Sequence, residues 1–365
     1  MYKLVVLETA MRIRAITLFA DYIRYRMNLP LIAKLFYNES LKSSLKHNVS
    51  IWTWRIALNP IKKDMLMDVA SSIESIPKEI NYIAIPLDGL SVDNVDNIIN
   101  LLANTDRIFL SIHGGEMEYS IFIQILKRLS SNPQLCTRIA FAIDKPILTP
   151  YFPLASSPEN GFGVASALLY VNDLLNTQEL NRRINEVFLK AYSIVNEVSL
   201  KLNAECYGVD LSLSPWMEES VALFIERIKG KPFNEGGTYK AIFNLNCLIK
   251  SISNQSKCVG FNEVMLPYAE DLRLMNLGER GLLSAYDLIS LASVCVAGLD
   301  MVVVPYGELE DILWDAYAVL KSKNQPSGVR VIPVKANSGD KINLGRFGTV
   351  PVMVLKHNVN RCCTC

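Results

Sequence analysis

The chain has 365 residues, of which half are hydrophobic and a fifth are charged, so a large core can be buried. Its 37 basic and 36 acidic residues nearly balance, which argues against a general nucleic-acid-binding surface. No apolar run is long enough to span a membrane, and the start, MYKLVVLETAMRIR, has too short an apolar stretch for a signal peptide. We therefore expect a cytoplasmic protein that binds neither nucleic acid nor membrane.

Strand-like apolar runs recur along the whole chain. In chain order they are Ile13–Phe19, Ser50–Leu58, Tyr82–Pro86, Arg107–His113, Arg138–Ile143, Ala204–Leu211, Val259–Leu266, Asp300–Pro305 and Val329–Val334. Helical patterns separate many of them, most clearly at Glu179–Asn203, where apolar residues recur on one face. This alternation predicts parallel strands with helices outside, and so many strands without a linker favour a closed or nearly closed α/β barrel.

The chain ends differ from this pattern. Because Met11 is followed by RIRAITLF, which is typical of a natural start, we interpret residues 1–10 as an extension and 11–356 as a single domain. Residues 357–365 contain Cys362, Cys363 and Cys365, for which a frayed reactive tail is favoured over a metal site, since no paired cysteines elsewhere offer further ligands. The loop Thr149–Gly163, rich in proline, is long enough to line a site.

Asp210 ends the strand pattern ECYGVD. The carboxyl ends of parallel strands commonly face the binding site, where an acid can bind a metal, act as a base or orient a hydroxyl. An Asp that caps turn amides is the alternative at equal odds. Ser212 follows as a candidate substrate-binding hydroxyl. Ser214 is the predicted N-cap of a helix that ends before Gly230, so Glu218 and Glu219 are mostly explained by the helix dipole.

Gly236, Gly237 and Thr238 come before the next predicted helix, with Thr238 as its N-cap. Two glycines leave backbone amides open to a carboxylate or phosphate, although a Gly-Gly turn alone is a weak signal. Earlier, Arg55 and Asn59 lie near a strand end in SIWTWRIALNP. Arg55 is predicted to pair with an anionic ligand or, alternatively, with an acid such as Asp210.

Further acids stand at two later junctions between elements. Glu270 and Asp271 come at a helix start, and Asp300 begins a strand. We interpret Asp210, Glu270 and Asp271 as candidate acid/base groups, and Asp210, Asp271 and Asp300 as candidate ligands for magnesium, calcium or manganese. Cys295 is a candidate nucleophile, but a position in the last turn of a helix would disfavour its thiolate.

Eight segments, in order from Met11 to about Val354, carry a family resemblance. They are RIRAITLF, TWRIALNP, PYFPLASSPENGFGVA, YGVDLSLSPWMEESVALFIE, NEGGTYKA, GFNEVMLPYAEDLRL, SVCVAGLDMVVVP and VRVIPVKANSGDKINLG. The chain resembles the domain of unknown function 711 (DUF711) family, the archaeal-type relatives of the bacterial uncharacterised protein family 0210. The resemblance implies a single ten-stranded α/β barrel like that of the pyruvate formate-lyase superfamily, commonly a homodimer. It brings no established reaction.

Several positions match the motifs of that family. They are Arg55, Asn59, Asp210, Ser212, Ser220, Gly237, Thr238, Glu270, Asp271, Cys295 and Asp300. Glycyl-radical chemistry is not expected, because the glycines of NLGRFGTVP lack the sequence context of a radical-bearing glycine. Two functions remain open: an enzyme acting on a small polar or anionic metabolite, with a divalent cation as candidate cofactor, and a non-catalytic metabolite-binding or regulatory protein.

Overall fold

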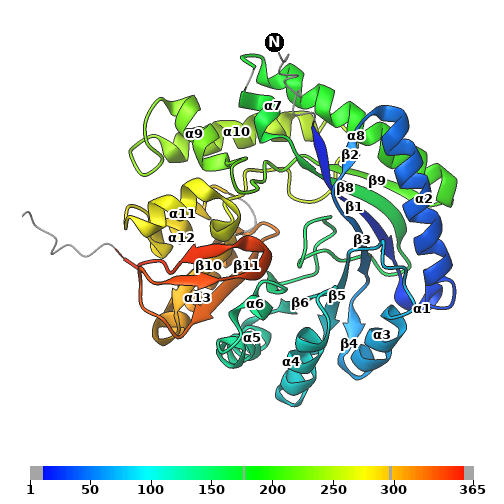
Figure 1. Cartoon of the computed structure of the whole chain (residues 1–365), viewed down its shortest axis with the longest axis horizontal. Helices are drawn as coiled ribbons and strands as arrows, with labels where there is room; N and C mark the ends of the chain where they lie inside the picture. Colours follow the sequence, from blue (N-terminus) through cyan, green and yellow to red (C-terminus); the bar gives the residue numbers. More distant parts are fainter. Residues whose placement is uncertain (1–10, 176, 296–297, 357–365) are drawn as a thin grey trace, which may run out of the picture.

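One curved eleven-stranded sheet organises the computed structural model, which describes residues 11–175, 177–295 and 298–356 (Figure 1). The hydrogen-bonded order is β10-β11-β7-β6-β5-β3-β1-β8-β9; β2 pairs with β1, β4 pairs with β5, and β12 and β13 form a separate hairpin. The strands are β1 Arg12–Ala20, β2 Ser50–Ile51, β3 Trp54–Leu58, β4 Ile61–Lys62, β5 Tyr82–Asp88, β6 Ile108–Gly114, β7 Ile139–Ile143, β8 Phe162–Leu169, β9 Glu205–Asp210, β10 Gly298–Pro305, β11 Gly328–Val334, β12 Lys341–Asn343 and β13 Thr349–Pro351.

The sheet is mostly parallel, with two reversals. Strands β1, β3, β5, β6 and β7 run in one direction. β8 is antiparallel to β1 and parallel to β9, while β11 is antiparallel to β7 and parallel to β10. The α/β class predicted from the alternating pattern is therefore confirmed, whereas the two antiparallel pairs differ from the parallel arrangement that was predicted.

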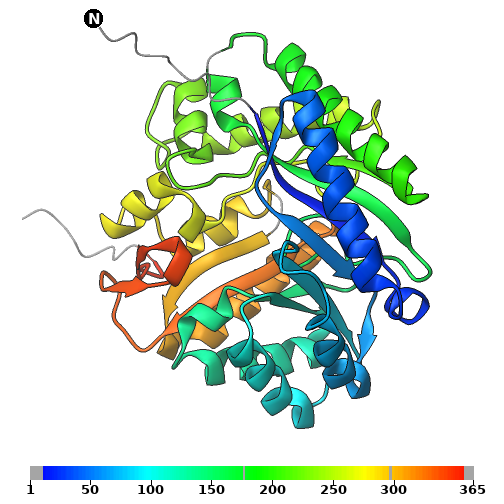
Figure 2. The ribbon, with the colours of Figure 1, turned by 45° about the vertical axis from the view of Figure 1, so that its right-hand side comes forward.

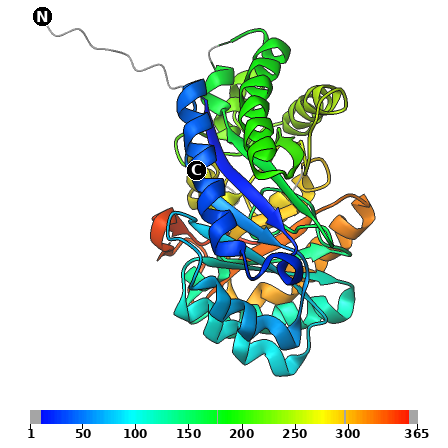
Figure 3. The same cartoon turned by 90° about the vertical axis from the view of Figure 1, so that its right-hand side faces the viewer.

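The helices lie around the outside of the strands (Figure 1). Figure 3 shows α2 and α8 side by side, and both contact the sheet near β1, β8 and β9. The helices are α1 Tyr22–Tyr25, α2 Leu29–His47, α3 Leu66–Ile73, α4 Val95–Asn104, α5 Glu116–Leu129, α6 Pro133–Cys136, α7 Val171–Leu175, α8 Leu180–Leu202, α9 Val221–Lys229, α10 Thr238–Ser253, α11 Leu272–Glu279, α12 Ala285–Leu291 and α13 Leu309–Lys323. Within the described residues, none is long and apolar enough to cross a bilayer.

Helix α8 confirms the clearest helical prediction. Its apolar stripe, from Ile184 to Val198, is buried against the sheet, as the spacing of three and four residues requires. The helix ends where Asn203 adopts a left-handed conformation with φ of 51°. Burial of this stripe fixes which face of α8 meets β8 and β9.

The closed ten-stranded barrel is not confirmed. The hydrogen-bonded order ends at β9 and β10, and no ladder joins these two strands in the described part of the chain. Residues 258–271 occupy the region between them: isolated bridges connect them to 209–217, and the 3-10 helix η3 (Tyr268–Glu270) contacts β10. The strand predicted at Val259–Leu266 is therefore wrong, because this segment makes isolated bridges in place of a ladder.

Two other local predictions are wrong. Strand β8 is absent from the predicted strands, because its small residues, FGVASALL, give a weak strand signal, and the loop predicted to run to Gly163 overlaps its first two residues. The helix predicted to start at Ser214 begins instead at Val221, where the side chain of Ser220 accepts from Leu223 N. Residues 1–10 and the cysteine-rich tail at 357–365 lie outside the described residues, so the predictions for them are not addressed.

Candidate functional site

A pocket of about 290 Å³ opens on the inner side of the curved sheet. Its lining takes Arg14 from β1, Arg55 from β3, Tyr82 from β5 and Phe109 from β6, all from the first three residues of their strands. The carboxyl ends expected to form the site therefore do not supply it on these parallel strands. The predicted site-lining loop does contribute, through residues 151–154.

Aromatic side chains form much of the wall. The rings of Trp52 and Trp216 meet edge to face with centroids 4.7 Å apart, and Arg14 Cζ lies 5.7 and 5.5 Å from them. Tyr82 and Phe109 form a second edge-to-face pair at 5.0 Å. Such walls favour a ligand with an apolar or planar body, because aromatic surface offers area without competing hydrogen bonds.

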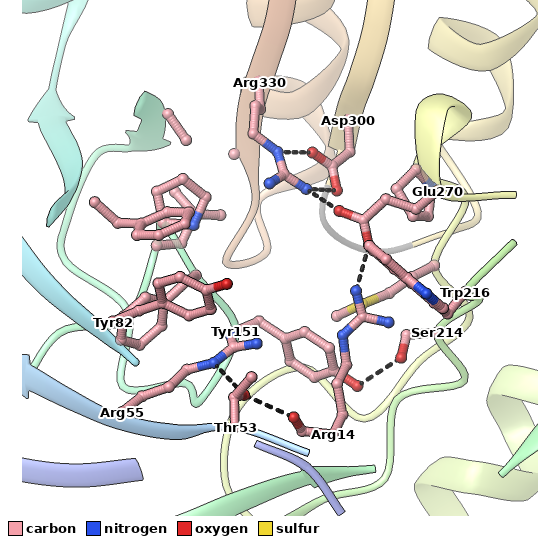
Figure 4. A pocket seen from close by; sticks show the side chains of 18 of the residues that line it. Arg14, Thr53, Arg55, Tyr82, Tyr151, Ser214, Trp216, Glu270, Asp300 and Arg330 are labelled. Atoms are coloured by element: carbon pink, nitrogen blue, oxygen red, sulfur yellow. Dashed lines mark hydrogen bonds and ion pairs between the residues drawn. The ribbon is translucent and has the colours of Figure 1, made fainter. Parts of the chain in front are cut away.

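A buried ion-pair cluster forms one side of the pocket (Figure 4). Glu270 in η3 accepts hydrogen bonds from both Arg14 and Arg330, the latter at 3.0 Å. Arg330 in β11 also donates to both oxygens of Asp300 in β10, at 2.6 and 3.0 Å. This bidentate geometry fixes the orientation of Arg330 and Asp300. The two arginines and two carboxylates of the cluster neutralise one another.

The two carboxyls of the cluster have pKa values shifted in opposite directions. Burial alone would raise the pKa of Glu270, but Arg14, Arg330 and Arg346 together lower it below its ordinary value. Burial raises the pKa of Asp300; Arg330 opposes this shift and Glu270 adds to it. Neighbouring carboxyls with diverging pKa values are a common feature of acid/base sites.

Arg55 lies across the pocket from this cluster and is 9% exposed (Figure 4). Its Nε donates to Thr53 Oγ1 at 2.9 Å, and its Cζ lies 5.0 Å from the Phe152 ring. Among the described residues, no carboxylate lies within ion-pair distance of it. Burial, together with the positive charges of Arg14 and Arg346, lowers the pKa of Arg55 to about 9. An unpaired buried cation of this kind favours an anion beside it.

Hydroxyl groups lie between the two charged sides. Tyr151 Oη is 3.2 Å from Ser214 Oγ, and burial raises the pKa of Tyr151. A phenol held neutral can donate a hydrogen bond to a ligand oxygen. The pocket therefore combines an unpaired cation, a hydroxyl pair and a carboxyl pair around one cavity.

The comparisons with known proteins identify the family. The model of the family described as "Uncharacterised ACR (DUF711)" matches residues 5–345. The chain belongs to the DUF711 family. It is 25% identical over 362 residues to the UPF0210 protein of Halothermothrix orenii, covering 85% of this chain and 80% of that protein. It is 24% identical over 344 residues to UPF0210 protein MK1214 of Methanopyrus kandleri, covering 82% of this chain and 76% of that protein.

These relatives do not show the archaeal-type part of the resemblance. Relatives named UPF0210 come from bacteria, among them Neisseria meningitidis at 25% identity over 364 residues, covering 86% of this chain and 81% of that protein, as well as from an archaeon. Of the residues that match the motifs of the DUF711 family, Arg55, Glu270 and Asp300 line the pocket.

Asp210, the leading candidate, is buried outside the pocket lining of this DUF711 protein. Its Oδ1 accepts from the Ser212 amide, the Ser212 hydroxyl and the Asn262 amide at 2.9, 2.6 and 3.1 Å. Its Oδ2 accepts from the Phe261 amide at 2.9 Å and from Thr149 Oγ1 at 3.3 Å. Asp210 therefore caps turn amides, as the alternative prediction states. Ser212 uses its amide and hydroxyl as donors to Asp210.

Asp271 has a similar structural role. It accepts from Ser220 Oγ at 2.6 Å and from the amides of Ala222, Arg273 and Leu274 at 3.1, 2.9 and 3.2 Å. The oxygens of Asp210 and Asp271 already accept several hydrogen bonds from the protein, and Asp300 is paired with Arg330. The predicted metal site is therefore not formed by these three acids. The described residues contain no group of three or more His, Cys, Asp or Glu able to hold a metal ion.

The remaining candidates also lie outside the pocket lining. Asn59 Oδ1 accepts from the Tyr22 amide at 2.7 Å. Gly236, Gly237 and Thr238 line a separate hollow at the start of α10, apart from the pocket that Arg55 lines. Thr238 is the first helical residue, after Gly237 as N-cap. Cys295 is buried beyond the end of α12, and burial raises its pKa to about 12.

Sequence reasoning missed Arg14, Arg330 and Arg346. For the first two a signal existed: each is a charged residue inside a strand pattern that is otherwise buried, in RIRAITLF and VRVIPV. A buried charge needs a partner or a ligand, so its presence in a core strand indicates a site. Arg346, in a short irregular segment, gave no such signal.

Proposed function

We propose that this DUF711 protein is an enzyme that acts on a small organic anion held in the pocket at the inner face of the sheet. The observation that carries the proposal is the unpaired, buried guanidinium of Arg55 in a cavity with aromatic walls. Arginine presents several N–H donors in a fixed plane, which suits a carboxylate or phosphate. The cavity of about 290 Å³ suits a small metabolite.

The carboxyl pair supports catalysis at this site. Asp300, with a raised pKa, faces the cavity beside Glu270, whose pKa is lowered. Asp300 would then exchange a proton with the bound anion while Glu270 stays ionised. Arg330 would hold Asp300 in position through its two hydrogen bonds.

A second candidate is a non-catalytic protein that binds the same ligand. The observation in its favour is that both oxygens of Glu270 and of Asp300 already accept from arginines. A general base normally has a free lone pair directed at the substrate. In this alternative Arg55 binds the anionic group of the ligand in the same way, and no proton is transferred.

Binding would be tested with a panel of small carboxylates and phosphates by isothermal titration calorimetry. We expect Arg55→Met to lower the affinity for the best ligand about 10- to 100-fold, because charge-assisted hydrogen bonds are lost. Arg128→Met is the matched control, since Arg128 is exposed on α5 and pairs with Asp96. Equal affinity in the wild type and Arg55→Met would contradict the proposal.

Catalysis would be tested on the ligand that binds best. Wild type and Asp300→Asn would be incubated with it and the products followed by mass spectrometry. We expect Asp300→Asn to retain binding and lose turnover, because asparagine keeps the shape without a titrating proton. Tight binding with no turnover in the wild type would favour the binding protein over the enzyme.

A further inference from the structure

A second arginine without a carboxylate partner lies at the mouth of the same pocket. Arg346 belongs to the 3-10 helix η5 (Gly345–Phe347), between β12 and β13. Figure 2 shows this C-terminal hairpin beside the α11 region, which β13 contacts. The Arg346 side chain is exposed, yet it lines the pocket with Arg55. In the described part of the chain no ion pair neutralises it.

Tyr82 is close to both unpaired arginines. Arg346 Cζ is 4.9 Å from the centre of the Tyr82 ring, and Arg346 Nη1 donates to Tyr82 Oη at 2.5 Å. Arg55 Cζ is 5.6 Å from the same ring centre. The two guanidinium carbons are therefore separated by no more than the sum of these two distances, which is a span that a small molecule can bridge.

The charge balance of the pocket points to the same two residues. Its lining holds four arginines and two carboxylates, an excess of two positive charges. Arg14 and Arg330 are paired with Glu270 and Asp300, so the excess belongs to Arg55 and Arg346. A single monoanion would leave one of these charges uncompensated, whereas a dianion would meet both.

We propose that the ligand is a small organic dianion, with one acidic group held by Arg55 and a second by Arg346. This inference rests on the proposed function and names its substrate class. Dicarboxylates, and carboxylates that also carry a phosphate, share this chemistry. The apolar body between the two acidic groups would lie along the aromatic side chains of Tyr82 and Phe109, which line the cavity and lie near Arg346.

The test compares anions of equal length with one or two acidic groups. The probes of equal length are butyrate and succinate, hexanoate and adipate, and octanoate and suberate, while glycolate and 2-phosphoglycolate test the phosphate-bearing class. Affinities are measured by calorimetry for wild type, Arg55→Met, Arg346→Met, Arg346→Lys and the control Arg128→Met. We expect the best-fitting dicarboxylate to bind wild type at least about tenfold more tightly than its monocarboxylate.

The variants separate the two arginines. Arg346→Met should weaken dicarboxylates much more than monocarboxylates and so remove the preference, while Arg55→Met should weaken both kinds of probe. Arg346→Lys should restore part of the preference, which a purely structural role of the hairpin would not predict. The preference should also shrink with added salt, because Arg346 is exposed.

Two results would overturn the inference, and they differ from failure of the proposed function. Equal affinity of wild type for mono- and dicarboxylates would show that Arg346 holds no second acidic group. An equal loss for both probe kinds in Arg346→Met would show that the hairpin only supports the pocket. If no anion binds wild type, or Arg55→Met binds as well as wild type, the anion pocket itself is wrong.

Discussion

Asp210 illustrates how a buried carboxylate can accept hydrogen bonds only from the surrounding protein and so stabilise the fold. Five donors from residues 149, 212, 261 and 262 converge on its two oxygens. Burial raises its pKa, and these hydrogen bonds oppose that shift. Because its lone pairs are occupied and it lies outside the pocket lining, Asp210 connects the end of β9 to the segment that begins at 258.

We predict that Asp210→Asn destabilises the protein without changing ligand affinity. The asparagine amide would place a donor against other donors, which costs roughly 2–3 kcal/mol in the free energy of unfolding. Urea denaturation would measure this loss, and calorimetry with the best anion would measure affinity in the folded fraction. Ser212→Ala, which removes one of the five donors, should cost less. A stable Asp210→Asn protein that no longer binds the anion would place Asp210 back in the site.

At the scale of elements, the strands with strong apolar patterns were predictable. The runs at Ile13–Phe19 and Val329–Val334 became β1 and β11 with no boundary shifted by more than one residue, because both faces are buried. β8 was missed because glycine, alanine and serine fill much of it. These small residues allow close approach of neighbours: a Cβ at Gly163 would lie 2.4 Å from the Tyr207 ring.

Helix starts were less predictable, because side chains far along the chain cap them. The first turn of α9 receives its cap from Ser220 and from Asp271, some fifty residues later. Ser214-Pro215 has the local signature of a helix start, yet Ser214 Oγ donates to the Leu168 carbonyl at 3.2 Å. A tertiary contact thus replaced the local cap, which no pattern in the neighbouring residues could indicate.

We predict that Asp271→Ala loosens α9 and α11 together. One carboxylate accepts from the first turns of both helices, and its removal would leave buried amides unpaired. The expected loss is roughly 3 kcal/mol in the free energy of unfolding. Hydrogen exchange should show faster amide exchange at residues 222–224 and 273–275.

Ser284→Ala at the start of α12 is the control, and as a single N-cap it should cost about 1 kcal/mol. Its effect should stay within α12. If Asp271→Ala left the exchange of α9 unchanged, the shared cap between the two helices would be disproved.

At the scale of the whole molecule, the site arises from residues that the chain order keeps apart. Arg14, Arg55, Glu270 and Arg330 come from β1, β3, η3 and β11 and meet only because the sheet curves. The sequence indicated an α/β fold, three charged lining residues and the loop that supplies residues 151–154 of the lining. It could not indicate which acids would accept hydrogen bonds from backbone amides, because that depends on the irregular path of residues 258–271.

We predict that Glu270→Gln destabilises the whole fold, because Glu270 connects distant strands. It pairs with Arg14 in β1 and Arg330 in β11, which four strands separate in the sheet order. Removing one member of a buried ion cluster leaves guanidinium charge uncompensated and costs about 3 kcal/mol in the free energy of unfolding. Urea denaturation at neutral pH would measure the difference from wild type.

The pH dependence of that difference provides a sharper test. Because the folded protein lowers the pKa of Glu270 below the ordinary 4.5, the ionised form contributes stability above that pH. The contribution is lost as the pH falls through the lower folded value, so wild type should lose stability on acidification faster than Glu270→Gln. Glu226→Gln, which removes a carboxylate paired with Arg273 far from the pocket, is the control for a general effect of the substitution. A wild-type advantage that did not shrink in acid would mean that Glu270 stabilises the fold through packing, and not through its charge.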